Sequence, residues 1–212
     1  VFSRMIYGAS RTIFSSLILV SLMFVFGSFI GIISGYIGGL FDNIVMRIVD
    51  VFLAFPSLVL AIAVAGVLGG GMINAMIAIG VIGWTKYARL ARGEVLEIKE
   101  ETFIKAARLS GNSSMYIVFK HIMPRVLSTL IVTASLDIGT TIMEMAALSF
   151  LGLSSPLPIP EWGAMMNEGK SMIQFAPWIT IAPGIAIFII VILFNLLGDV
   201  VHDMLDPKQK EY

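Results

Sequence analysis

The sequence predicts an all-α protein whose helices form a polytopic transmembrane bundle. Of its 212 residues, 58% are hydrophobic and only 13% are charged, and the mean hydropathy is +0.94. An average soluble domain carries about 25% charged residues, so this chain has too little charge to cover a water-exposed surface. The apolar residues form long unbroken runs, whereas a transmembrane β-barrel shows short segments of alternating polarity. These observations exclude a soluble enzyme and a nucleic-acid-binding protein.

About 20 helical residues cross the hydrocarbon core of a bilayer, and the apolar runs predict five spans. The first lies near 13–34. The run 51–85 is too long for one span at 1.5 Å per residue, and the glycines at 69–71 interrupt it, so it predicts two spans. The fourth covers 126–151 and the fifth 178–198. Because the chain does not begin with methionine, a segment upstream is also expected.

Basic residues set the expected orientation because cytoplasmic connections collect Lys and Arg. Eight of the fourteen bases lie between Lys86 and Arg125, in the connection after the third span. Lys86 and Arg89 stand at the end of that span, where their long side chains can reach the membrane interface. With this connection in the cytoplasm, eleven bases are inside and three are outside. The first residue is then outside and the last is inside.

The sequence contains no cysteine and two histidines. Disulfides, thiolate metal sites, cysteine nucleophiles and a histidine-rich metal cage are therefore excluded. A membrane enzyme is disfavoured because no nucleophile, base and orienting group occur together in the sequence. Neither catalytic nor metal-binding residues are predicted.

The cytoplasmic connection predicts a hairpin of two short amphipathic helices. The first, 102–110, places Phe103, Ala106 and Ala107 on one face. It is expected to end at Gly111, because glycine readily adopts the left-handed conformation of a C-terminal cap. The glycine would then set the angle between the two helices.

The second helix of the hairpin is expected to begin after Ser113, whose hydroxyl suits an N-cap, and to end at Pro124. Its apolar stripe consists of Met115, Val118, Phe119 and Ile122. The pattern fits a connector on the membrane surface and a docking element for another protein equally well. A DNA-reading helix-turn-helix is disfavoured because the four acidic residues of this connection would oppose contact with phosphates.

Asp137 and Glu144 lie seven residues apart on the fourth span, which is two helical turns, and share one polar face with Thr133, Thr140 and Thr141. Carboxylates at this depth face a bundle interior or a watery cavity, because lipid opposes their charge. Two interpretations remain open: contacts between helices, or the wall of a translocation pathway. A proton relay in an ion-coupled transporter is less favoured, because such transporters are built from inverted repeats and none is evident.

The hairpin also resembles a known motif. Lys105-Ala106-Ala107, then Gly111, then His121-Ile122-Met123-Pro124 resembles the EAA loop in the membrane subunits of binding-protein-dependent ABC importers. Lys105 stands where glutamate is usual and Met123 where leucine is usual. His121 in place of isoleucine is similar to the dipeptide, oligopeptide and nickel branch.

The resemblance to that branch covers nearly the whole chain. Its segments are 1–10, 50–57, 148–153, 160–165 and 194–199. The resemblance implies a single permease domain of the MetI-like type over residues 1–212, with a coupling hairpin at about 93–125. Members of this branch usually have six spans, which implies that a sixth span is missing upstream of this chain.

The resemblance further implies that the hairpin sits in a cleft of a cytoplasmic ATPase and couples its motion to the spans. The coupling residues would be Lys105, Ala106, Ala107, Arg108, Gly111, His121 and Pro124. The expected partners are a second, different permease subunit, two ABC ATPase subunits, an external solute-binding protein and the lipid bilayer, with no nucleic acid. The chain would be no enzyme and would bind no cofactor itself, because ATP and Mg belong to the ATPases.

The implied function is ATP-driven import of dipeptides or oligopeptides across the cytoplasmic (inner) membrane of a bacterium or archaeon. Import of nickel or a metal chelate is the alternative within the same branch. In either case Thr133, Asp137, Thr140, Thr141 and Glu144 are the candidates for the pathway wall. Trp162 and Trp178 are expected as anchors at the membrane interface or as part of the surface that receives the solute-binding protein.

Overall fold

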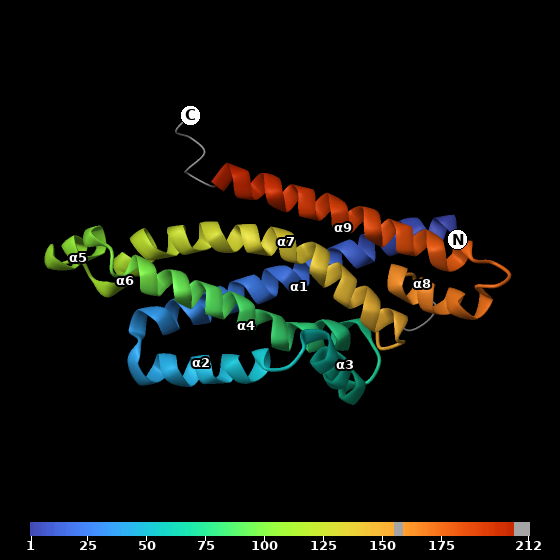
Figure 1. Ribbon diagram of the computed structural model, residues 1–212, viewed down its shortest axis with the longest axis horizontal. Coiled ribbons are helices and arrows are strands. Elements are labelled where there is room, and N and C mark those ends of the chain that lie inside the picture. The colour runs from blue at the N-terminus through green and yellow to red at the C-terminus, as the bar shows by residue number, and fades with distance from the viewer. Residues whose placement is uncertain (155–158, 206–212) are drawn as a thin grey trace.

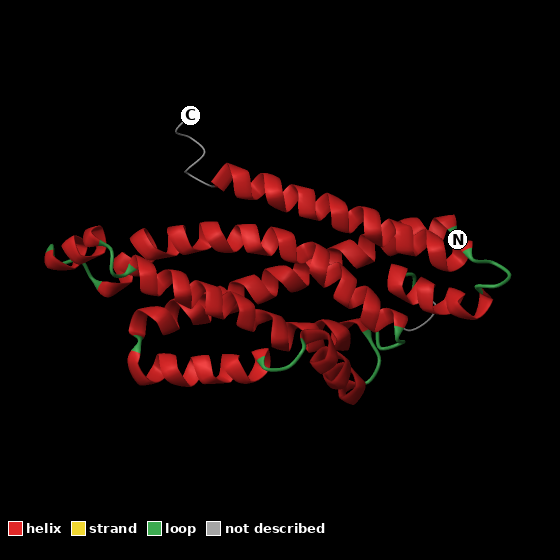
Figure 2. Ribbon diagram, in the orientation of Figure 1, coloured by secondary structure: helices red, strands yellow, loops and turns green. Residues whose placement is uncertain are grey.

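The computed structural model describes residues 1–154 and 159–205, and within these ranges it contains helices and loops but no strand (Figure 2). The all-α prediction is confirmed. The long helices are α1 (Phe2–Ile37), α2 (Gly39–Leu53), α4 (Met72–Ile98), α7 (Met123–Phe150) and α9 (Trp178–Leu205). The shorter helices are α3 (Ser57–Leu68), α5 (Thr102–Leu109), α6 (Ser114–Ile117) and α8 (Trp162–Gly169), with a π-helical turn at Val118–Ile122 and a 3₁₀ turn at Lys170–Met172.

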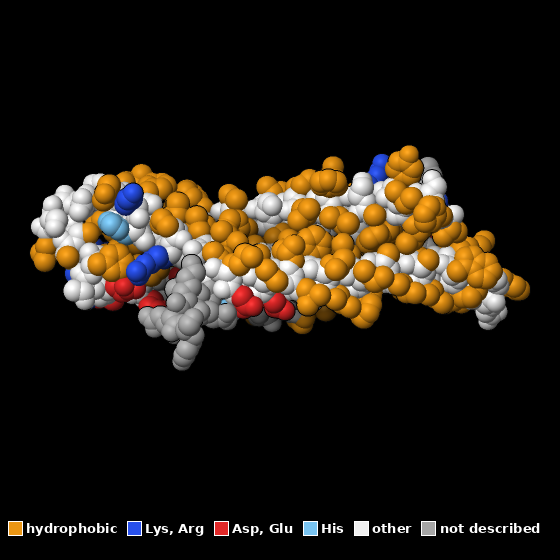
Figure 3. All heavy atoms as spheres, turned by 90° about the horizontal axis from the view of Figure 1, so that it is seen from above, with side chains coloured by type: hydrophobic (Ala, Val, Ile, Leu, Met, Phe, Trp, Pro, Cys, Tyr) orange, Lys and Arg blue, Asp and Glu red, His pale blue; other side chains and the backbone are white. Residues whose placement is uncertain are grey.

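The long helices lie along one axis of an elongated bundle (Figure 1). The hairpin formed by α5 and α6 is at one end, and α8 lies with the N-terminus at the other end. In a view of one face, hydrophobic side chains cover most of the body, and most of the visible charged side chains gather toward the hairpin end (Figure 3). The two connections that the charge count places on opposite sides of the membrane are thus at opposite ends of the molecule.

The number of spans differs from the prediction. Among the residues that the structure describes, three segments are long and apolar enough to cross a membrane: Phe2–Ile37, Ser114–Phe150 and Trp178–Leu205. Helices α2 and α3 add a fourth span if they count as one, although they are bent by 88° relative to each other. The predicted count of five is therefore too high by this measure.

Two features explain the difference. Pro56 precedes α3 and has no backbone N–H to donate, so the apolar run of the predicted second span breaks there and changes direction. The predicted third span lies in α4, which continues to Ile98 and carries Lys86, Arg89 and Arg92 in its second half. These charges make α4 less apolar than the other long helices, although it runs along the same axis (Figure 1).

Glycines of α1 bring this helix into close contact with α4. Gly27, Gly31 and Gly35 follow one another at intervals of four residues and therefore share one face of α1. A Cβ atom at Gly31 would clash with the carbonyl oxygen of Ala88, and one at Gly35 would lie 3.0 Å from the carbonyl oxygen of Arg92. Small residues at such spacing let two membrane helices approach until their backbones touch. The position of α4 thus depends on the absence of side chains on this face of α1.

We expect Gly31→Ala to lower the free energy of unfolding by about 1–3 kcal/mol, because overpacking a close helix contact forces the backbone to move. The measurement is thermal unfolding of the purified protein in detergent. Gly66→Ala is the matched control, since a Cβ atom there meets nothing within 4 Å and alanine stabilises a helix interior by about 0.5–1 kcal/mol relative to glycine. Equal stability of the two variants would contradict the close contact.

Candidate functional site

The first helix of the hairpin has the predicted extent and cap. Helix α5 ends at Leu109, and Gly111 adopts φ of +81°, in the left-handed region. The N–H of Gly111 donates to the carbonyl oxygen of Arg108 at 3.0 Å, and Asn112 Nδ2 donates to that of Ala107, also at 3.0 Å. These bonds satisfy carbonyl groups at the end of the helix. The glycine turn is therefore a defined structure.

The second helix begins as predicted but does not end where predicted. The Ser113 hydroxyl accepts a hydrogen bond from the N–H of Tyr116 at 3.3 Å, which confirms the N-cap. Pro124 does not stop the helix, because the π-helical turn at Val118–Ile122 leads directly into α7 and places Pro124 in the first turn of α7. Proline is tolerated there because the first amides of a helix have no intrahelical acceptor. The hairpin is thus continuous with a long helix of the bundle.

Buried and exposed residues divide the hairpin into an anchored side and a free side. Ile104, Ile117 and Ile122 are fully or almost fully buried. In contrast, Leu109 is 90% exposed and Met115 is 68% exposed. Large apolar side chains at a water-facing tip are typical of a surface that another protein covers.

Aromatic and charged contacts hold the two hairpin helices together. The ring of His121 lies between Phe103 and Tyr116, with ring centroids 5.9 Å and 5.8 Å away. Arg125 lies 4.5 Å from the centroid of Phe103 and donates to Glu101 Oε1 at 2.8 Å. His121 is therefore a structural part of the hairpin, because it joins its two helices.

Lys105 and Arg108 are exposed, and each has a contact close to the hairpin. The Lys105 ammonium lies 3.1 Å from Glu100 Oε2 and holds the pKa of Glu100 below its ordinary value by hydrogen bonding and by charge. Arg108 lies 5.8 Å from the ring centroid of Tyr36 at the end of α1. Ala106 is exposed between them, so this side of α5 presents a small residue flanked by two cations.

The bases of α4 are paired with neighbouring helices. Arg92 donates to Asp42 Oδ2 of α2 at 2.6 Å, and the Ser34 hydroxyl of α1 donates to Asp42 Oδ1, also at 2.6 Å. Arg89 pairs with Asp50 of α2. Arg89 and Arg92 lie in the sequence segment predicted as a connection, but they belong to α4 and link it to the helices beside it.

A small charged cavity of about 290 Å³ lies among α1, α3, α4 and α7. Lys86 of α4 donates to Asp137 Oδ1 of α7 at 2.6 Å, and the Ser57 hydroxyl of α3 donates to Glu144 Oε1 at 3.1 Å. The other polar lining residues are Thr85, Thr140 and Thr141. Side chains of opposite charge therefore meet around one cavity from separate parts of the chain.

This cavity contains four of the five residues proposed for the pathway wall. Asp137, Thr140, Thr141 and Glu144 line it, whereas Thr133 does not, and its hydroxyl donates to the carbonyl oxygen of Thr129 at 3.3 Å. Sequence reasoning missed Ser57 and Lys86. Lys86 was expected to reach the membrane interface, but it pairs with Asp137. A lysine and a carboxylate on apolar helices are a signal for such a pair, but only the fold shows which carboxylate is near.

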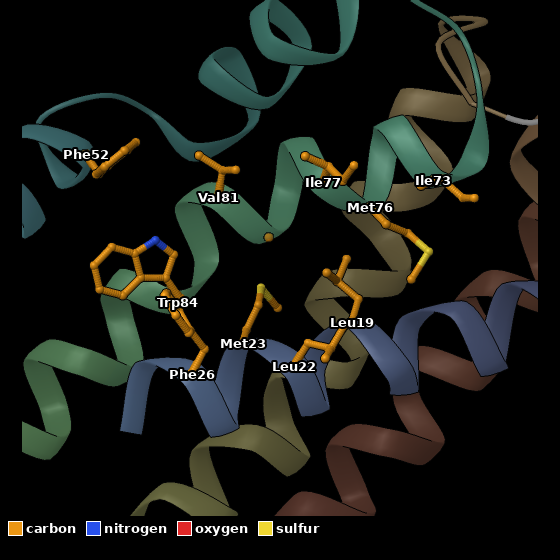
Figure 4. Close-up of a pocket in the computed structure, with 11 residues that line it drawn as sticks. Leu19, Leu22, Met23, Phe26, Phe52, Ile73, Met76, Ile77, Val81 and Trp84 are labelled. Atoms are coloured by element: carbon orange, nitrogen blue, oxygen red, sulfur yellow. The ribbon is translucent and has the colours of Figure 1, made fainter. Parts of the chain in front are cut away.

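A second, larger cavity is apolar. It has a volume of about 720 Å³ and lies between α1, α2 and α4, where Leu19 and Phe26 of α1 approach Met76 and Trp84 of α4 (Figure 4). Ligand sites combine apolar walls with a few polar groups that fix orientation, and the lining of this cavity contains no charged side chain. Met23 lines both cavities. The smaller charged cavity is therefore the better candidate for recognition of a polar solute.

The outer end is more tightly packed than predicted. Trp162 is only 6% exposed, and its Nε1 donates to the carbonyl oxygen of Met5 at 3.0 Å. Both expectations for Trp162, an interface anchor and an exposed docking residue, are therefore wrong, because the indole packs between α8 and α1. Trp178 is 60% exposed. Arg4 and Glu168 form a bidentate ion pair, with nitrogen to oxygen distances of 2.7 Å and 2.5 Å, that also joins α1 to α8.

Comparison with known proteins identifies the family. Residues 27–211 match the binding-protein-dependent transport system inner membrane component. The chain belongs to this family. It is therefore a multi-pass inner membrane permease, a transport subunit and not an enzyme.

The permease is similar over nearly its whole length to curated relatives. It is 43% identical over 210 residues to the dipeptide transport system permease protein of Alkalihalophilus pseudofirmus, covering 99% of this chain and 69% of that relative. It is also 43% identical over 210 residues to the glutathione transport system permease protein of Pectobacterium atrosepticum, covering 99% and 70%.

Solved structures support the fold of the permease. An inward-facing structure of the MetNI methionine ABC transporter matches with a TM-score of 0.74 at 20% identity, over 96% of each chain. A crystal structure of an amino acid ABC transporter with histidines matches with a TM-score of 0.66 at 14% identity, over 94% of this chain and 92% of that one. At these identities the likeness concerns the fold alone, and it confirms the MetI-like permease architecture.

The ion pairs of α4 differ in burial, which predicts different effects of their removal. Asp42 is 7% exposed in its side chain, whereas Asp50 is 52% exposed. We expect Asp42→Asn to lower the free energy of unfolding by about 1.5–3 kcal/mol, because it weakens buried charged hydrogen bonds. Asp50→Asn is the matched control, with a change below about 1 kcal/mol. Thermal unfolding in detergent measures both variants, and equal losses would contradict a larger contribution from the buried Asp42 pair than from the exposed Asp50 pair.

Proposed function

We propose that this permease is the membrane-spanning subunit of an ATP-driven importer that moves dipeptides or oligopeptides across the cytoplasmic membrane of a bacterium. The observation that carries the proposal is the hairpin, which is anchored on one side, exposes Leu109 and cations on the other, and lies at the end opposite α8 (Figure 1). Relatives named for dipeptide and glutathione transport favour peptides over the nickel alternative.

The hairpin is the proposed contact with the cytoplasmic ATPases, which bind ATP and Mg. The coupling residues are Lys105, Ala106, Ala107, Arg108, Gly111, His121 and Pro124. The hairpin follows α4 and leads through the π-helical turn into α7. When ATP closes the ATPases, they displace the hairpin and with it the two helices that carry Lys86 and Asp137. Alternating access then corresponds to a shift between two packings of these helices.

The proposed assembly contains a second, different permease subunit, two ATPase subunits and an external solute-binding protein. The pathway lies at the interface of the two permeases, with Asp137, Thr140, Thr141 and Glu144 on its wall. Thr133 lies nearer the hairpin on the same helix, α7, and contributes a further hydroxyl group to the pathway wall. The solute-binding protein docks at the end that carries α8, opposite the ATPases.

Uptake in proteoliposomes tests the function. The full-length permease, reconstituted with its partner permease, both ATPases and the solute-binding protein, is expected to accumulate a labelled dipeptide only when ATP is supplied. Proton uncouplers are expected to leave this uptake unchanged, because the energy comes from the ATPases. Uptake that is independent of ATP and abolished by proton uncouplers would contradict an ABC importer and support an ion-coupled transporter.

Gly111 provides a test of coupling. Left-handed backbone costs an ordinary residue about 1–2 kcal/mol, which lowers the ratio of correctly formed to unformed hairpin about 5–30-fold, and the cost is higher still for a β-branched side chain. We therefore expect Gly111→Val to reduce ATP-driven uptake strongly, while Gly111→Asn retains most of it because asparagine tolerates this conformation.

The two Gly111 variants also separate backbone from side-chain effects. A Cβ atom at Gly111 meets nothing within 4 Å, so the difference expected between the two variants comes from the left-handed backbone. Co-purification of the ATPases and the ATP hydrolysis rate are measured beside uptake. Equal uptake by Gly111→Val and wild type would show that the glycine turn has no part in coupling.

A further inference from the structure

We propose that the charged cavity binds both ends of a short zwitterionic peptide, with Glu144 taking the α-ammonium group and Lys86 taking the α-carboxylate. This inference rests on the proposed function, because it specifies how the permease recognises a peptide in its pathway. The cavity is lined by Lys86, Asp137 and Glu144 together with hydroxyl groups, so it offers partners for both charges of a peptide.

Glu144 is suited to the ammonium group. Its carboxylate accepts a hydrogen bond from the Ser57 hydroxyl at 3.1 Å, and among the residues that the structure describes it forms no ion pair. A carboxylate at this depth is stabilised by a cation or by water. A peptide ammonium supplies the cation together with three N–H donors, and charged hydrogen bonds of this type are stronger than neutral ones.

Lys86 is suited to the carboxylate because its pairing with Asp137 leaves donors unused. A lysine ammonium has three N–H donors, and the bond to Asp137 Oδ1 at 2.6 Å uses one of them. A peptide carboxylate can therefore bind Lys86 while Asp137 remains its partner. In the absence of a peptide, the bond to Asp137 directs the ammonium group toward α7.

The dimensions favour short peptides. Asp137 and Glu144 are separated by about 10 Å along α7, at 1.5 Å per residue, and two to three extended residues span about 7–11 Å. The cavity of about 290 Å³ is at the lower limit of ordinary ligand pockets, which begin near about 300 Å³. A longer extended peptide exceeds this distance, and the volume of the cavity leaves little room for it to bend.

Binding of blocked peptides tests this assignment. The complete transporter, without its solute-binding protein, is placed in nanodiscs and titrated calorimetrically with L-alanyl-L-alanine, its N-acetyl derivative and its C-terminal amide. In the wild type, each blocked peptide is expected to bind at least about tenfold more weakly, because one charged hydrogen bond is lost. Omitting the solute-binding protein removes its own selectivity from the measurement.

Variants assign each end of the peptide. Glu144→Gln is expected to abolish the discrimination against the acetylated peptide and to leave that against the amide. Lys86→Gln combined with Asp137→Asn, which removes the ion pair without leaving an unpaired charge, is expected to have the reverse effect. Arg89→Gln is the matched control, since it removes a neighbouring ion pair of α4 outside the cavity, and it is expected to retain both discriminations.

Three results would overturn the inference: no binding of L-alanyl-L-alanine to the wild type, equal binding of all three peptides, or variants that weaken all three alike. The proteoliposome assay keeps this failure separate from failure of the proposed function. If ATP-driven dipeptide uptake persists while the discrimination is absent, only the two-ended site is wrong. If ATP-driven uptake itself is absent, the proposed function fails.

Discussion

Helix α4 carries cations along a bundle whose surface is mostly apolar, and each of them must be paired or hydrated because isolated charge in a medium of low dielectric is costly. Arg92 meets this constraint through Asp42 of α2, and Lys86 meets it through Asp137 of α7. The same helix is held against α1 by contacts that only glycines such as Gly31 allow. Position and charge of α4 therefore determine where α1, α2 and α7 can lie.

Local signals in the sequence were sufficient for several features. Left-handed backbone favours glycine and an N-cap favours serine, so Gly111 correctly predicted the end of the first hairpin helix and Ser113 the start of the second. Seven residues make about two helical turns, and Asp137 and Glu144 indeed line the same cavity. Each of these predictions depends on a few neighbouring residues of one helix, and helical geometry is nearly independent of the remaining fold.

Features that depend on distant parts of the chain could not be predicted in this way. Proline favours a helix break at both Pro56 and Pro124. Pro56 accompanies an 88° bend between α2 and α3, whereas at Pro124 the π-helical turn continues directly into α7. The partner of Lys86 and the burial of Trp162 follow from the approach of α7 and of α1, whose contacting residues are 51 and 157 positions away along the chain. The four-residue interval between Gly27, Gly31 and Gly35 is typical of a helix that packs closely against another, but it does not predict which helix packs there.

In the proposed cycle, the ATPases and the transported peptide act on the same ion pair, between Lys86 and Asp137. The hairpin joins α4 to α7, so a displacement of the hairpin changes the relation between the helices that hold Lys86 and Asp137. A peptide carboxylate on Lys86 competes electrostatically with Asp137 and weakens the same link from the side of the cavity. A ligand shifts a conformational equilibrium only by its differential affinity for the two states, and this ion pair gives a peptide that difference. Recognition of a peptide is thereby linked to the packing that ATP controls.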